Sequence, residues 1–133
     1  MIDPDIQALL DDFGRRFPAI LERWRGVDDV MTTSRMEAFA ALTTVDLGKD
    51  DPRDGAAQLA YMSARLRSAS AKEREYIDAY YVEALFFEAS DRAIERGWPL
   101  VPANLKQLYI AFHGGPPLTR AERAKQARKA KRK

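Results

Sequence analysis

Large apolar residues recur at intervals of three and four residues along almost the whole chain. This spacing is typical of one face of an α-helix, whereas the alternation of apolar and polar residues that marks a half-buried strand is missing. The first such group is Ile6, Leu9, Leu10 and Phe13. The pattern predicts an all-α fold, a single-domain bundle of about five to six helices.

Glycine, proline and capping residues divide this pattern into segments. Asp3 and Pro4 are suited to cap and begin the first helix. Two capping boxes, formed by Ser34-Arg35-Met36-Glu37 and Ser70-Ala71-Lys72-Glu73, predict the starts of two later helices. Gly97 predicts the end of the second of these.

The segment from residue 71 to residue 96 is predicted to be the long central helix of the bundle. At about 100° per residue its large side chains cover almost the whole circumference, which is typical of a helix packed on several sides. We therefore expect Ile77 and Phe87 to be buried, with alanine at either position costing about 2 to 5 kcal/mol.

The side chains that most catalytic and metal sites need are nearly absent. The chain has no cysteine and one histidine, so thiolate chemistry, zinc fingers and multi-histidine metal sites are excluded. No glycine-rich loop precedes a helix in a way that would bind phosphate. We expect no catalytic residue, no cofactor and no metal, and we expect that the protein is not an enzyme.

Three ionisable residues could each have either a chemical role or a structural one. Glu83 and Asp91 fall among apolar neighbours, where they could form an acid/base or metal site, or, as we favour, an internal salt bridge. The arginines suited to such a bridge are Arg35, Arg65 and Arg67. His113 ends a short apolar helix, and capping of carbonyls is favoured there over a general base.

The charge is divided unevenly along the chain. Residues 120–133 hold eight of the 22 Lys and Arg and one of the 20 Asp and Glu, which leaves 14 basic and 19 acidic residues in the rest. We therefore divide the chain into a helical bundle, residues 1–118, and a basic tail, residues 119–133, that is disordered or loosely helical. The candidate nucleic-acid-binding residues are the cations of the tail: Arg120, Arg123, Lys125, Arg128, Lys129, Lys131, Arg132 and Lys133.

Three short stretches resemble a family of small, uncharacterised bacterial α-helical proteins, some of which are immunity-protein-like. These stretches are Ile77-Asp78-Ala79-Tyr80-Tyr81-Val82-Glu83, Gly97-Trp98-Pro99-Leu100-Val101-Pro102 and Phe112-His113-Gly114. The resemblance covers roughly residues 8 to 117 and implies a cytoplasmic binding protein without an activity of its own. It carries over no site residue, and it leaves the basic tail outside.

Together these observations favour a non-catalytic protein-binding module, such as an immunity-like inhibitor of a cationic toxin, since the body is acidic. Trp24, Trp98, Tyr76, Tyr80 and Tyr81 could form its recognition surface, although core packing is the better interpretation for most of them. The alternative is association with nucleic acid through the basic tail; a small enzyme with a carboxylate site is the weakest reading. The opening residues resemble no signal peptide and no apolar run spans a bilayer, so we expect a cytoplasmic protein without a membrane partner.

Overall fold

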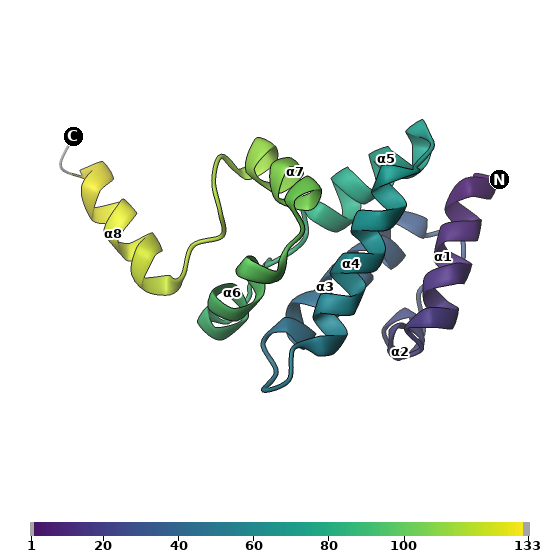
Figure 1. Ribbon diagram of the computed structural model, residues 1–133, viewed down its shortest axis with the longest axis horizontal. Coiled ribbons are helices and arrows are strands. Elements are labelled where there is room, and N and C mark those ends of the chain that lie inside the picture. Colours follow the sequence, from purple (N-terminus) through teal and green to yellow (C-terminus); the bar gives the residue numbers. More distant parts are fainter. Residues whose placement is uncertain (1, 132–133) are drawn as a thin grey trace.

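The computed structural model describes residues 2–131, and that part of the chain is helical, without a strand (Figure 1). The all-α prediction is confirmed. The predicted count of about five to six helices is too low, because short helices replace one long one. The elements are α1 (Pro4–Arg16), α2 (Ala19–Trp24), α3 (Thr32–Leu47), α4 (Arg53–Arg67), α5 (Ala71–Tyr76), the π-helical segment η1 (Ile77–Val82), α6 (Asp91–Gly97), the 3-10 segment η2 (Trp98–Leu100), α7 (Ala103–His113) and α8 (Arg120–Lys131).

The central element of the bundle is α3, which contacts α1, α2, α4, η1 and α6. The prediction that residues 71–96 form a long central helix is therefore wrong. Helix α3 is buried on several sides although it is rich in small and polar residues. Thr43 and Thr44 turn their hydroxyls back to the carbonyls of Phe39 and Ala40, at 3.1 and 2.9 Å, which satisfies these groups inside the core.

The predicted long helix is broken twice. After α5 the backbone widens into η1, where the amide of Glu83 donates to the carbonyl of Asp78 at 3.1 Å. A turn then follows, in which Phe86 and Glu88 have φ angles of 63° and 53°. These left-handed angles do not fit a right-handed α-helix, so the helix ends here. Ser90 then caps α6 by accepting a hydrogen bond from the amide of Ala93.

The turn places two adjacent phenylalanines in opposite environments, one in the core and one in solvent. Phe86 is buried, with 6% of its surface exposed, and it packs against Trp98 and Tyr109. Phe87 is 75% exposed, so its predicted place in the core is wrong, whereas Ile77 is buried as predicted. A straight helix would carry both phenylalanines on neighbouring faces, and the left-handed residues are what allow one to point inward and the other outward.

Several predicted helix starts are confirmed. Asp3 accepts hydrogen bonds from the amides of Asp5 and Ile6, and Ser70 accepts one from the amide of Glu73 at 3.3 Å. The capping box at Ser34 is wrong, because α3 begins two residues earlier, at Thr32, without a side-chain cap. An aliphatic and aromatic core holds these helices together, so tertiary packing compensates for the missing cap.

Aromatic rings join four elements in the middle of the core. The ring of Phe13 on α1 lies 4.1 Å from that of Phe39 on α3, and Phe39 lies 5.3 Å from Tyr81 on η1. Trp24 on α2 packs on the other side of Phe13, at 5.8 Å between ring centroids. Of the five aromatics considered for a recognition surface, Trp24 and Tyr81 are buried and the other three are partly buried against the core: Tyr76, Tyr80 and Trp98.

The side chain of Leu47, at the end of α3, lies between two glycines on other helices. A Cβ atom added to Gly55 on α4 would lie 2.8 Å from Leu47 Cγ, and one added to Gly97 on α6 would lie 2.9 Å from Leu47 Cδ1. These distances are shorter than carbon atoms tolerate, so only glycine lets the three helices approach so closely.

The basic segment is a regular helix from Arg120 to Lys131, with no buried residue. Thr119 and Glu122 form a reciprocal cap at its start. Figure 1 places α8 at the opposite end of the molecule from α1. Two of the predicted nucleic-acid-binding residues, Arg132 and Lys133, lie outside the described residues.

Candidate functional site

The three ionisable residues considered for catalysis do not form a catalytic arrangement in the structure. His113 Nε2 lies 3.1 Å from the backbone carbonyl oxygen of Glu83, so its ring contacts the end of η1 and no side-chain acid. Its ring also stacks on Tyr109, with 4.1 Å between centroids. Asp91 accepts the amide of Arg120 at 2.8 Å. None of these contacts orients a base towards a nucleophile.

Within residues 2–131 neither acid forms an ion pair with an arginine, so the favoured internal salt bridge is not found there. Glu83 is partly exposed, and its pKa is raised mainly by burial and further by the nearby charge of Asp78, while His113 opposes the shift. Asp91 is exposed at the first turn of α6. Of the three arginines proposed as partners, Arg35 binds Asp29 and Arg65 binds Glu73. Within residues 2–131 no group of three or more His, Asp or Glu could hold a metal ion.

A buried polar network between α3, α4 and η1 was not predicted. Asp46 accepts from Gln58 Nε2 at 2.9 Å and pairs with Lys49 Nζ at 2.8 Å. Thr43 bonds Gln58 Oε1 at 2.6 Å and Tyr81 Oη at 2.9 Å. The contact with Asp46 raises the pKa of Lys49, and burial raises the pKa of Tyr81. The members contact one another across three elements, so the network joins these helices.

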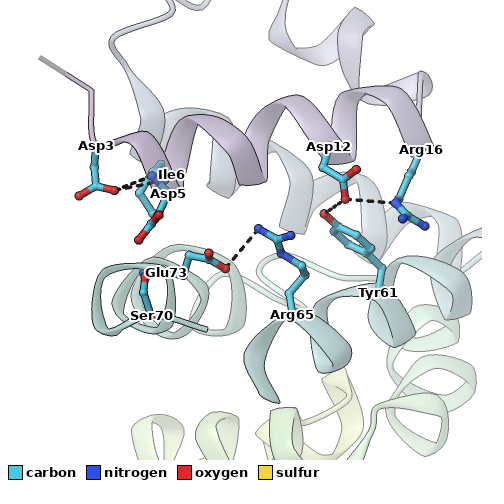
Figure 2. A network of polar contacts seen from close by, with 9 residues as sticks. All are labelled: Asp3, Asp5, Ile6, Asp12, Arg16, Tyr61, Arg65, Ser70 and Glu73. Atoms are coloured by element: carbon cyan, nitrogen blue, oxygen red, sulfur yellow. Dashed lines mark hydrogen bonds and ion pairs between the residues drawn. The ribbon is translucent and has the colours of Figure 1, made fainter. Parts of the chain in front are cut away.

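A second polar cluster covers the junction of α1, α4 and α5, and Figure 2 shows it. Tyr61 donates to Asp12 Oδ2 at 2.6 Å, and Arg16 pairs with the same carboxylate at 3.1 Å. The hydrogen bond from Tyr61 is the main reason why the pKa of Asp12 is lowered, and burial raises the pKa of Tyr61. Arg65 pairs with Glu73 at 3.3 Å. Each of these two carboxylates is paired with an arginine, so the cluster joins the helices.

The turn between η1 and α6 presents a different kind of surface, which we call the Phe87 surface. It consists of the exposed ring of Phe87, the half-exposed Val45 on α3, and the groove between them. The amide of Phe86 donates to Thr44 Oγ1 at 3.0 Å, which fixes the turn on α3. The groove has a volume of about 400 Å³. Small residues form much of its lining: Ala41, Gly48, Ala89 and Ala93.

Charged residues beside the Phe87 surface largely neutralise one another. A second hollow of about 670 Å³ is lined by three acids and three cations, which come from the loop before α4, the start of α4 and Arg92 on α6. Arg53 pairs with Asp51 at 2.7 Å, and Arg92 pairs with Asp50. Sequence reasoning missed the Phe87 surface, because nothing in the periodicity distinguishes a left-handed turn from continued helix.

The predicted nucleic-acid-binding residues that the structure describes all lie on α8 and are exposed: Arg120, Arg123, Lys125, Arg128, Lys129 and Lys131. The structure brings them together on one projecting helix, far from the Asp12 cluster (Figure 1). None of them takes part in an ion pair among the described residues.

A comparison with known proteins finds one family. A family model described as Domain of unknown function (DUF7674) matches residues 10–114, nearly the stretch over which the resemblance was drawn, and α8 lies outside it. No curated protein and no solved structure matches the chain. No helix in residues 2–131 has the length and apolar character to cross a membrane.

Proposed function

Since the chain belongs to the DUF7674 family of domains of unknown function, we propose from its own residues that it is a non-catalytic protein-binding module. The observation that carries the proposal is the outward-facing ring of Phe87, which the fold holds in solvent on a left-handed turn. Phe87 would be the central anchor of the contact.

The backbone of the turn supports this role. Phe86 and Glu88 each adopt a left-handed conformation that costs a residue other than glycine about 1 to 2 kcal/mol. Burial of Phe86 and the hydrogen bond to Thr44 offset that cost. Phe87 offsets none of this conformational cost in the free protein, because a ring that is 75% exposed contributes little to the core.

The surroundings of Phe87 have the organisation of an interface. An apolar centre formed by Phe87, Val45 and the small residues of the groove is bordered by Lys49, Glu88 and Ser90. Binding sites between proteins commonly have an apolar middle, a polar rim and an aromatic residue that carries much of the binding energy. A partner would place an apolar side chain in the groove and a hollow over the ring.

The charge of the body supports a cationic partner, as an immunity-like inhibitor of a cationic toxin would have. Residues 1–119 contain 14 basic and 19 acidic residues, so the body attracts a basic protein over a distance of about 8 to 10 Å at physiological ionic strength. Glu88 lines the groove of the Phe87 surface and has no ion-pair partner within residues 2–131, so it is the acid best placed to contribute to that attraction.

Affinity capture from the native host tests the proposal when three versions of the full chain are compared: wild type, Phe87→Ala, and the control Leu21→Ala. Leu21 is also exposed, but it lies on α2, away from the turn (Figure 1). We expect a stoichiometric protein partner with wild type and Leu21→Ala, and at least a tenfold weaker interaction with Phe87→Ala, since interface anchors contribute about 2 kcal/mol or more. Retention of the partner by Phe87→Ala, or no stoichiometric partner with any version, would overturn it.

A further inference from the structure

Helix α8 combines a fixed start with a completely exposed remainder. Thr119 is buried, its hydroxyl and amide donate to Glu122 Oε1 at 2.9 and 3.1 Å, and Arg120 donates its amide to Asp91 on α6. The backbone hydrogen bond from Thr119 is the main cause of the lowered pKa of Glu122. The helix therefore leaves the body in a defined direction.

Beyond this first turn nothing in the body stabilises the helix. None of its 12 residues is buried, and its apolar side chains are all alanine: Ala121, Ala124, Ala127 and Ala130. Helices of this length are marginal in water without packing, and repulsion among their cations weakens them further. A ligand that neutralises the cations would supply the missing stabilisation.

The chemistry of α8 selects the class of ligand. An apolar groove on a protein or the interior of a membrane would need large apolar side chains, and α8 has none. Single-stranded nucleic acid is bound by stacking on aromatic rings, which α8 also lacks. Phosphate groups remain as the partner that its arginines and lysines fit.

The distribution of the cations around the helix selects the shape of the ligand. At about 100° per residue, the six described cations span an arc of about 240°, so a flat anionic surface would meet only part of them. The major groove of B-form DNA is about 12 Å wide, which accommodates an α-helix with a phosphate wall on each side. The major groove of duplex RNA is too narrow for side chains to enter.

We propose that α8 binds double-stranded DNA by lying in the major groove, with its arginines and lysines contacting phosphates on both walls. The helix is about 18 Å long, about half a turn of DNA, so about five phosphate contacts are available to it. The contacts are to the phosphate backbone, so binding is largely independent of base sequence. The body of the protein has a net negative charge, so the DNA phosphates repel it.

Fluorescence anisotropy with a labelled 20-base-pair DNA of mixed sequence tests this on the full chain. We expect log affinity to fall against log salt with a slope of about −4 to −5. Replacing Arg123, Lys125, Arg128 and Lys129 with glutamine should make the slope shallower by about 3 to 4. Phe87→Ala should bind DNA like wild type, which separates this test from that of the proposed function.

A pair of proline variants separates a helix in a groove from a cluster of charge. Ala127→Pro keeps every cation but breaks the helix in its middle, and we expect at least a tenfold loss of affinity. Ala121→Pro is the control, because proline is tolerated in the first turn of a helix, and it should bind within about twofold of wild type. Equal binding by the two variants would contradict the groove model.

Competitors of equal charge decide between the possible polyanions. Duplex DNA should compete at least tenfold better than duplex RNA, single-stranded DNA, or vesicles with a third of anionic lipid. Equal competition by any of these, salt-insensitive binding, or no binding at 50 mM salt would refute the proposal.

Discussion

Replacing Glu88 with glycine should stabilise the fold even though it removes a side chain. The φ angle of Glu88 is 53°, where the Cβ atom crowds the next carbonyl oxygen and costs about 1 to 2 kcal/mol. The side chain is exposed, and within residues 2–131 its carboxylate has no ion-pair partner that would be lost.

The size of the gain follows from two opposing effects. Glycine removes the left-handed penalty, but it also adds about 0.5 to 1 kcal/mol of backbone entropy to the unfolded chain. The free energy of unfolding should therefore rise by about 0.5 to 1 kcal/mol, which is a rise in Tm of about 2 to 4 °C for a chain of this size.

Urea unfolding followed by circular dichroism at 222 nm measures this difference, with the slope m checked for constancy. Glu88→Ala is the matched control, because alanine keeps the left-handed penalty and should lie within about 0.5 kcal/mol of wild type. If glycine lowered the stability, or alanine raised it as much as glycine, the backbone at residue 88 would not be strained. Phe87 would then be held outward without a conformational cost.

Three further substitutions follow from the packing. Ile77→Ala should lower the free energy of unfolding by about 2 to 5 kcal/mol in chemical denaturation, because its side chain is fully buried. Asp46→Ala should lower it by about 2 to 3 kcal/mol, because Gln58 loses its charged acceptor inside the core. Tyr61→Phe should cost about 0.5 to 1.5 kcal/mol at pH 7. The folded-state pKa of Asp12 is lowered, so this contribution is present above about pH 4 and is lost as the pH falls through the lower value; the two unfolding curves should converge there.

Matched controls accompany these measurements. Ile110→Ala, an exposed isoleucine on α7, and Glu37→Ala, an exposed acid on α3, should each change stability by less than about 1 kcal/mol. A loss at Ile110 equal to that at Ile77 would contradict the assigned core. A Tyr61→Phe deficit that stays constant from pH 7 to pH 2.5 would show that the hydroxyl does not act through the Asp12 carboxylate.

The sequence predicts the helices whose apolar residues follow one stripe, and α1 is the clearest example. Its cap at Asp3, its first residue and its buried face all agree with expectation. The central position of α3 was not predictable in this way, because Thr43, Thr44 and Asp46 are of polar types that are mostly exposed in proteins. They are buried only because partners far along the chain, such as Gln58 and Tyr81, satisfy them.

The turn at residues 83–90 escaped prediction for a different reason. Continuous apolar residues favour a helix locally, and the chain has neither glycine nor proline there to indicate a break. Burial of Phe86 against Trp98 and Tyr109, together with the bond from its amide to Thr44, outweighs that local preference. The position of each cation of α8 can be taken directly from the sequence. Their arrangement on a regular helix was not predicted.

Leu47 contacts both Gly55 and Gly97, so the residue type tolerated at each of these three positions depends on the other two. The three helices share one small volume there, so an added methyl group at either glycine needs a smaller side chain at position 47. Relatives with alanine at 55 or 97 should therefore carry a compensating residue at 47, and the three positions should vary together. A redesign of the α3–α4 loop or of α6 has to treat them as one unit.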